Sequence, residues 1–288
     1  MTNNPNPIED HYTSGALGAA ILAALQGMGK DIDHLTPDDL AAVDEFHGGQ
    51  RPATVRLAEL LDLGGSERVL DVGCGLGGPS RFLAWRYGVR VSGIDLTAEF
   101  VRVAQMLTRR TGLAGQVDYR QGDALDLPFE DASFDVVWSQ NAAMNIADRD
   151  RLYRGMRRVL KPGGRLALQE VAAGPGGPPH FPVQWAREPA ISHLFSADAT
   201  RAKLEAAGFR VVIWQDTTAE ALASAARRTR TTSDAPPPLG THLILGDDWR
   251  AMFKNSARNL EERRTELFNA ILEQAEEPAF SSAASQRA

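Results

Sequence analysis

Three carboxylates in this sequence follow apolar runs at positions that suit ligand binding. The segment VLDVGCGLGG at 69–78 places Asp71 at the end of an apolar run, just before a series of glycines. Asp95 and Asp123 each end a later apolar run. If these runs are parallel strands, their carboxyl ends meet at one edge of a sheet, where ligands bind. Asp95 there suits the two hydroxyls of a ribose, and Asp123 suits an exocyclic adenine amine.

The glycine turn is compatible with two kinds of nucleotide ligand. Residues 73–78 match the G-x-G-x-x-G pattern of turns that receive the pyrophosphate of a dinucleotide. However, the negative charge of Asp71 repels a pyrophosphate and attracts an ammonium or a sulfonium. The sequence therefore favours S-adenosylmethionine over NAD, and an NAD-dependent oxidoreductase is the alternative.

The elements that position these carboxylates alternate between strands and helices. Alternation of this kind predicts an α/β fold with a doubly wound, mostly parallel seven-stranded sheet and helices on both faces. We expect the first six strands at 68–72, 89–95, 116–123, 133–140, 165–171 and 209–216. The segment 264–274 fits helix and strand periodicity equally, and we expect a closing antiparallel strand there.

Segments outside this alternation are expected to cover the site. Residues 1–64 have helical periodicity and are predicted to form an N-terminal lid before the Rossmann-like catalytic domain at 65–275. Within that domain, the inserted loop at 172–195 follows the fifth strand, and a second insertion spans 217–260. Both are expected to cap a substrate. The Ser- and Ala-rich segment 276–288 is expected to be a disordered tail.

Composition narrows the class of partner and the compartment. The chain has 288 residues and a net charge of −6, and its arginines are scattered, so we expect no nucleic acid partner. The N-terminus lacks a basic region and the apolar run at 16–25 is short, so we expect neither an export signal nor a membrane span. Cys74 is the only cysteine, which fits a cytoplasmic location. No metal site is expected, and homo-oligomerisation is left open.

Several motifs together resemble a known family. VLDVGCGLGG, GIDLT, GDALDLPFEDASFDVVWSQ and VLKPGG occur in the order of class I S-adenosylmethionine-dependent methyltransferases, across roughly residues 45–215. The later motifs are similar to the branch with the sarcosine/dimethylglycine and ubiquinone/menaquinone methyltransferases. The resemblance implies methyl transfer to a small-molecule acceptor, by N- or O-methylation ahead of C-methylation of a quinone-like ring. A protein that binds S-adenosylmethionine without transferring methyl is the non-enzymatic alternative.

The resemblance also implies which residues contact the methyl donor. The glycines of the turn are expected along its methionine portion, Asp95 at its ribose, and Leu96 and Ala124 against its adenine. Ser139 and Gln140, at the end of the fourth strand, are expected beneath the methyl donor. The full expected set is Tyr12, Asp71, Gly73, Gly75, Gly77, Asp95, Leu96, Asp123, Ala124, Ser139 and Gln140.

Candidate catalytic residues lie in the segments expected to cover the site. Methyl transfer is an in-line displacement, so alignment and exclusion of water supply much of its acceleration. A phenol, a carbon acid or a protonated amine must also lose a proton. His47 in the lid and His180 in the 172–195 loop are the candidate bases, with Glu170 and then His193 as further ones. Asn141 is a candidate catalytic position, but it is neutral where the dimethylglycine branch carries an acid, which disfavours a dimethylglycine-like substrate.

Overall fold

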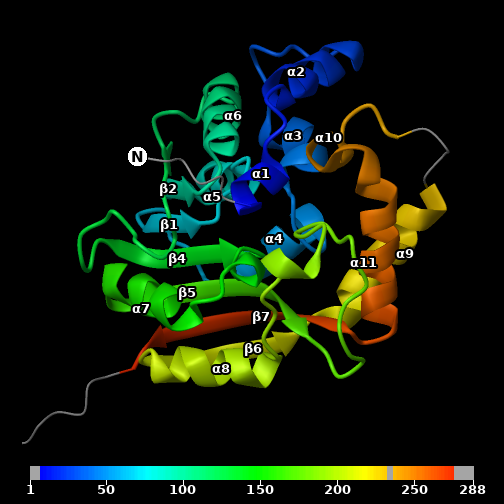
Figure 1. Cartoon of the computed structure of the whole chain (residues 1–288). Helices are drawn as coiled ribbons and strands as arrows, with labels where there is room; N and C mark the ends of the chain where they lie inside the picture. The colour runs from blue at the N-terminus through cyan, green and yellow to red at the C-terminus, as the bar shows by residue number, and fades with distance from the viewer. Residues whose placement is uncertain (1–6, 232–235, 276–288) are drawn as a thin grey trace, which may run out of the picture.

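A computed structural model of the chain describes residues 7–231 and 236–275. Seven strands within these residues form one sheet. Their order in the sheet is β3-β2-β1-β4-β5-β7-β6 (Figure 1). The strands are β1 (Arg68–Val72), β2 (Arg90–Asp95), β3 (Val117–Gln121), β4 (Phe134–Gln140), β5 (Leu160–Ala173), β6 (Phe209–Asp216) and β7 (Thr265–Gln274). The predicted fold class is therefore confirmed.

The seventh strand differs from the others in direction. β7 runs antiparallel to both β5 and β6, whereas the remaining neighbours in the sheet pair in parallel. Most of its residues are buried, since helices or loops cover both faces of the sheet. Its apolar residues at 267, 268, 270, 271 and 272 are too closely spaced to alternate strictly, which explains why its periodicity was compatible with a helix. The expected closing strand is confirmed.

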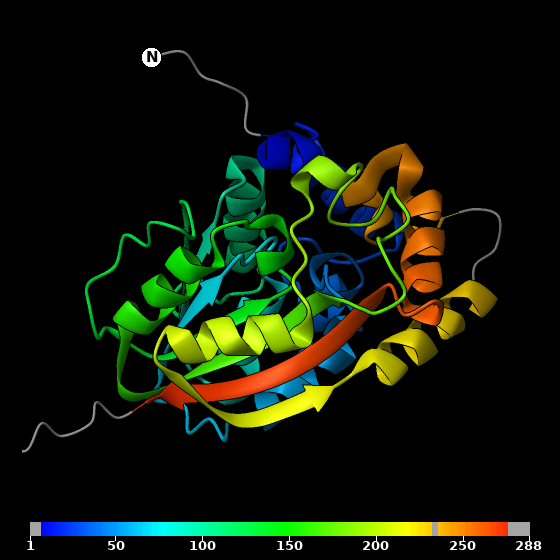
Figure 2. The same cartoon turned by 60° about the horizontal axis from the view of Figure 1, so that its bottom comes forward.

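Helices cover both faces of the sheet. Leu152 and Leu204 belong to the apolar cluster on one face, and Leu57 and Leu83 belong to the cluster on the other. Figure 2 shows α8 lying along the sheet beside β6 and β7. The helices of the first face are α7 (Arg149–Val159) and α8 (Ala197–Ala206), and those of the second are α4 (Gln50–Glu59), α5 (Gly78–Tyr87) and α6 (Ala98–Arg110).

The N-terminal helices are tied to the sheet domain through polar groups as well as apolar ones. They are α1 (Pro7–Tyr12), α2 (Leu17–Gly27) and α3 (Pro37–Asp44). Thr36 begins α3 with a reciprocal capping box to Asp39. The α6 carboxylate of Glu99 accepts hydrogen bonds from the backbone amides of Ser14, Gly15 and Leu17 at 2.7, 2.8 and 3.0 Å. It thereby anchors the start of α2.

The two insertions lie beside the N-terminal helices. The loop after β5 is ordered and contains a 3₁₀ turn at Pro189–Ile191, and the second insertion contains α9 (Thr218–Thr231), α10 (His242–Leu245) and α11 (Trp249–Glu261). Ile21 and Leu25 of α2 share an apolar cluster with Leu239 and Ile244. The N-terminal helices and the second insertion therefore pack against each other at one end of the sheet (Figure 1). The expected tail at 276–288 lies outside the described residues.

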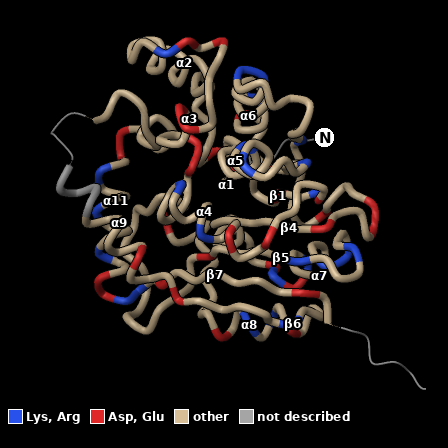
Figure 3. The backbone as a smooth tube through the Cα atoms, turned by 180° about the vertical axis from the view of Figure 1, so that it is seen from behind, with Lys and Arg blue, Asp and Glu red and all other residues tan. Residues whose placement is uncertain are grey.

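Charged side chains are distributed widely along the described chain. Figure 3 shows Lys and Arg interspersed with Asp and Glu around the molecule. No described helix has the length and apolar character that a bilayer crossing requires. Within the same residues, no group of three or more His, Cys, Asp or Glu side chains is arranged to hold a metal ion.

Candidate active site

A cavity of about 440 Å³ opens where β1, β2 and β4 end. This size is ordinary for a site that holds a small molecule. The expected donor residues that line it are Tyr12, Asp71, Gly73, Gly75, Asp95, Leu96, Asp123, Ala124 and Gln140. The structure therefore brings together residues from the α1 segment, the glycine turn and the ends of three strands.

The end of β2 and the glycine turn are joined through Asp95. Its carboxylate accepts hydrogen bonds from the backbone amides of Gly75 at 2.8 Å and Thr97 at 2.9 Å. Gly75 has a φ of 53°, in the left-handed region that glycine tolerates best. Burial raises the pKa of Asp95, and the two amides oppose that shift. Since each carboxylate oxygen can accept more than one hydrogen bond, Asp95 can still receive ligand hydroxyls.

Asp71 is a buried acid in the wall of this cavity. Its residue is only 2% exposed, and Ser80 Oγ donates to its Oδ2 at 2.5 Å. Burial raises the pKa of Asp71 to about 7, against the opposing effect of the Ser80 hydrogen bond. A cationic ligand beside Asp71 would favour its ionised form.

Two expected donor residues do not line the cavity. Gly77 begins α5 with a φ of 78°, and a Cβ built there would lie 2.2 Å from the Tyr119 hydroxyl oxygen. Its glycine is needed for packing against β3. Ser139 is fully buried and donates to the Val72 carbonyl at 2.9 Å, so its hydroxyl joins β4 to β1.

The charge of the larger cavity has one sign. Its described lining contains no Lys or Arg. Five carboxylates line it: Asp44, Asp71, Asp95, Asp123 and Asp148. Such a cavity attracts cations and repels phosphates. It therefore fits a sulfonium nucleoside and does not fit the pyrophosphate of a dinucleotide.

A second cavity of about 90 Å³ adjoins the larger one. Tyr12, Phe46, His47 and Asn141 line both cavities and so form the boundary between them. The remaining described lining is mainly apolar or small and comes from the segments before α4 and after β4, from β5, β7 and the loop after β5, and from α9 and α11. It includes Met144, Val171, Trp185, Ala221, Ala225, Phe253, Leu260 and Leu267.

His47 is held at this boundary by a buried polar network. Its Nε2 lies 2.8 Å from Glu45 Oε2 and 3.0 Å from Thr54 Oγ1, and the Glu45 side chain is fully buried. Arg51 Nε also donates to Glu45. Burial on its own would raise the pKa of Glu45, but hydrogen bonds from His47 and Thr54 and the charge of Arg51 outweigh it and lower the pKa. Glu45 is therefore an anion in the folded protein. Its contacts could not be predicted from sequence spacing.

His180 does not lie at either cavity, so the structure does not support its expected catalytic role. Its Nε2 contacts Glu262 Oε2 at 2.9 Å, and its backbone amide donates to Asn259 of α11. The loop around it packs beside α11, where Asn255 donates to the Pro182 carbonyl and Asn259 donates to the His180 carbonyl. Glu170 is buried with Arg149 Nη1 3.8 Å away, but it too is absent from both described linings.

The asparagines after β4 have structural roles at the boundary. Asn141 has a φ of 51°, and its backbone amide donates to the Gln169 carbonyl at 2.8 Å. Asn145 accepts from the Tyr12 hydroxyl at 3.2 Å. Its amide nitrogen donates to the Trp185 and Ile191 carbonyls, each at 2.8 Å. Asn145 therefore connects the N-terminal helix to the loop after β5.

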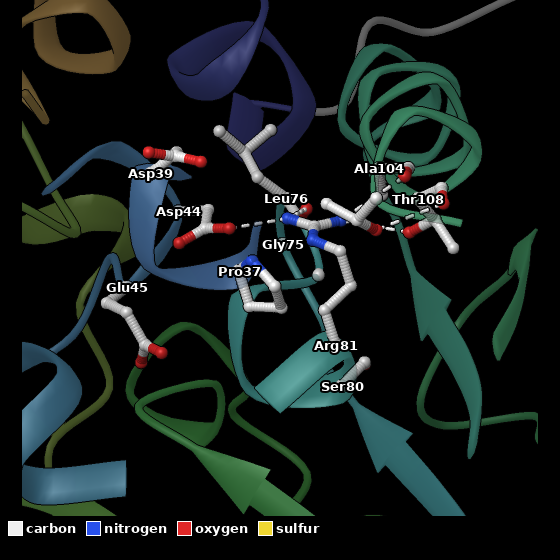
Figure 4. A network of polar contacts seen from close by, with 12 residues as sticks. Pro37, Asp39, Asp44, Glu45, Gly75, Leu76, Ser80, Arg81, Ala104 and Thr108 are labelled. Carbon is white, nitrogen blue, oxygen red and sulfur yellow. Dashed lines mark hydrogen bonds and ion pairs between the residues drawn. The ribbon is translucent and has the colours of Figure 1, made fainter. Parts of the chain in front are cut away.

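A buried ion pair beside the glycine turn was not anticipated from the sequence. Figure 4 shows Arg81 of α5 reaching Asp44 at the end of α3, with a 2.6 Å contact between Nη2 and Oδ2. The guanidinium also donates to the Leu76 carbonyl at 2.6 Å and to Thr108 Oγ1 at 3.0 Å. Both partners of the pair are fully buried. Only the contact of α3 with α5 brings them together.

The sheet order and the cavity at its carboxyl ends define a nucleoside-binding protein of the Rossmann-like class. A methyltransferase domain model matches residues 70–168 of this chain. The O-methyltransferase rstn1 of Aspergillus nomiae is 31% identical over 180 residues, which make up 62% of this chain and 80% of that protein. The chain belongs to the class I S-adenosylmethionine-dependent methyltransferase family.

Other relatives differ in length or in reaction. The methyltransferase GfsG of Streptomyces halstedii is 38% identical over 133 residues, which cover 46% of this chain and 48% of GfsG. This chain therefore spans about half the length of that relative. The crystal structure of the [4+2]-cyclase SpnF matches with a TM-score of 0.65 and 23% identity, covering 95% of this chain and 99% of SpnF. The last likeness concerns the fold alone.

Proposed function

We propose that this protein transfers a methyl group from S-adenosylmethionine to a small-molecule acceptor. The observation that carries the proposal is the larger cavity, with five carboxylates and no Lys or Arg in its described lining. S-adenosylmethionine supplies an activated methyl group on a cationic sulfur. The same lining disfavours an NAD-dependent oxidoreductase, because it offers carboxylates and no Lys or Arg to the dinucleotide pyrophosphate.

Different residues of the cavity would contact different parts of the donor. Asp95 would accept the ribose hydroxyls, and Leu96 and Ala124 would contact the adenine, with Asp123 at its amine. Gly73 and Gly75 would allow the methionine portion to approach the backbone. Family resemblance supports each of these roles, and the cavity lining is compatible with them.

The acceptor would occupy the smaller cavity, so that the two substrates meet at the boundary. N- and O-methylation are the leading reactions, ahead of C-methylation of a quinone-like ring. Residues 1–64 would act as a lid, and 172–195 and 217–260 would cap the acceptor. Closure of these segments would exclude water and align the acceptor atom with the methyl group.

Ligand-induced stabilisation tests the donor site. S-adenosylhomocysteine should raise the melting temperature of the purified protein and NAD should not, since only a ligand that binds the folded state stabilises it. Asp95→Ala should abolish the rise. Asp126→Ala is the matched control, because Asp126 is an exposed carboxylate outside both described linings. Equal stabilisation of the Asp95→Ala variant would contradict the ribose assignment.

Turnover needs its own test, because donor binding does not establish reaction. The protein is incubated with methyl-labelled S-adenosylmethionine and pooled amines, carboxylates, phenols and quinols, and products are identified by mass spectrometry. A labelled product supports the proposal. Saturable S-adenosylhomocysteine binding without any labelled product would favour the non-catalytic alternative.

Location and assembly remain predictions from the sequence. The single cysteine favours a reducing cytoplasm, and the scattered charges disfavour nucleic acid as a partner. Homo-oligomerisation is open to test by sedimentation at several protein concentrations.

A further inference from the structure

The boundary between the two cavities fixes where methyl transfer would occur. A methyl group on a donor in the larger cavity can meet an acceptor in the smaller one only beside Tyr12, Phe46, His47 and Asn141. Phe46 has no proton-accepting group, and the amide of Asn141 is not basic. Burial strongly raises the pKa of Tyr12, which keeps its phenol protonated. Among these four residues, only His47 has a basic ring nitrogen that can accept a proton.

The contacts of His47 leave one ring nitrogen available. Nε2 is engaged by Glu45 and Thr54 at 2.8 and 3.0 Å. Nδ1 has a 3.4 Å contact with the Gly48 carbonyl, which is longer than an ordinary hydrogen bond. A carboxylate that holds one nitrogen of an imidazole fixes its tautomer and stabilises the imidazolium that forms when the other nitrogen is protonated. Nδ1 is therefore the proton-accepting atom.

The side chains of His47, Arg51 and Thr54 keep Glu45 in place. Thr54 Oγ1 donates to Glu45 Oε2 at 2.6 Å, and Arg51 Nε donates to the other oxygen. Thr54 also contacts Gln140 Oε1 at 3.2 Å, which links the network to the end of β4. The base is thus positioned by the sheet as well as by the N-terminal segment.

The smaller cavity favours an uncharged acceptor. Its described lining contains no Asp or Glu that could accompany an ammonium group, and it is walled by side chains such as Met144, Trp185 and Leu260. A neutral tertiary amine would need no base. A hydroxyl on an apolar molecule satisfies both the apolar walls and the buried base.

We propose that His47 is the catalytic base and Glu45 its positioning residue, and that the acceptor is a hydroxyl group on a neutral, largely apolar molecule. This inference rests on the proposed function. The acceptor oxygen forms a bond to the methyl carbon while the carbon–sulfur bond of the donor breaks, and its electron pair stays on sulfur. The hydroxyl proton passes to His47 Nδ1 and is later released to solvent.

Two phenols of different acidity test the proton transfer. Phenol is largely protonated at pH 8, whereas 4-nitrophenol is largely ionised and needs no base. His47→Gln should lower kcat with phenol by about 10²- to 10⁴-fold, the usual contribution of a general base. Its kcat with 4-nitrophenol should fall by less than about 10-fold. Both reactions are followed with methyl-labelled S-adenosylmethionine by mass spectrometry.

His180→Gln is the matched control, because His180 forms a similar 2.9 Å pair with Glu262 outside both cavities. It should leave both rates unchanged. The His47→Gln variant should retain saturable S-adenosylhomocysteine binding, which shows that its fold is intact. An equal loss with both phenols would overturn the catalytic role of His47.

Glu45→Gln separates positioning from structure. It should lower kcat with phenol by at least about 10-fold, with little change in KM or in the 4-nitrophenol rate. An equal fall in both rates would leave Glu45 with a structural role only. Wild-type protein that methylates amines but neither phenol would overturn the acceptor class and leave the proposed function standing. No labelled product at all, despite S-adenosylhomocysteine binding, would contradict the proposed function itself.

Discussion

The buried carboxyl of Asp71 should make folding stability depend on pH, and Asp71→Asn should remove that dependence. The pKa of Asp71 is about 7 in the folded protein, against 3.8 as its ordinary value. Between these two values the folded state binds the more protons, so stability falls as the pH rises. Linkage gives a destabilisation of about 2 kcal/mol at pH 5 that grows to about 4 kcal/mol at pH 8.

The Asn side chain carries no charge at either pH. Asp71→Asn should therefore be stabilised relative to wild type, by roughly 2 to 3 kcal/mol more at pH 8 than at pH 5. The measurement is urea unfolding of both proteins at the two pH values, with Asp126→Asn as an exposed control. The contribution of Glu170, whose pKa burial also raises to about 7, is common to both proteins and cancels in the difference. Parallel pH dependence in wild type and Asp71→Asn would refute the reasoning.

Two further predictions concern the attachment of the N-terminal helices. Glu99→Gln should lower the free energy of unfolding by at least about 2 kcal/mol at pH 7, because it replaces a carboxylate that accepts three backbone amides. Burial tends to raise the pKa of Glu99, but hydrogen bonds from these amides outweigh it and lower the pKa. The difference in unfolding free energy between wild type and Glu99→Gln, measured by urea unfolding, should therefore vanish as the pH falls through the acidic range. Arg81→Met should cost about 3 to 5 kcal/mol by leaving Asp44 buried and unpaired, and the double variant Arg81→Met/Asp44→Leu should recover much of that loss. A double variant no more stable than Arg81→Met would contradict the pairing.

That the proposed donor residues line one cavity could be predicted from the sequence, because each of them belongs to a local motif. Asp71 and Asp95 end apolar runs, and the fold rule that strand ends meet at one edge converts that spacing into proximity. Whether a given glycine lines the cavity or packs against another part of the protein was less predictable. Gly75 lines the cavity, whereas Gly77 is required by the Tyr119 side chain, and nothing in the G-x-G-x-G pattern separates a ligand contact from a packing contact.

The acceptor half could not be predicted in the same way. His47 and His180 had equal standing in the sequence, since each lies in an irregular segment beside glycines. Their locations depend on where the insertions pack: α11 holds His180 at the surface, while α4 supplies Thr54 to the network around His47. Side-chain partners that come from distant segments leave no periodic signal in the sequence.

The charges of the two cavities imply different contributions to the proposed reaction. The sulfur carries its full positive charge before methyl transfer and loses it as the carbon–sulfur bond breaks. Carboxylates such as Asp71 and Asp95 therefore bind the donor at least as well as the transition state, and interactions of that kind raise affinity without raising kcat. The acceleration must arise at the boundary, where an uncharged wall aligns the acceptor and the His47–Glu45 pair stabilises a charge that develops only as the proton moves. Substitutions among the carboxylates should then change KM for the donor, and substitutions at His47 should change kcat.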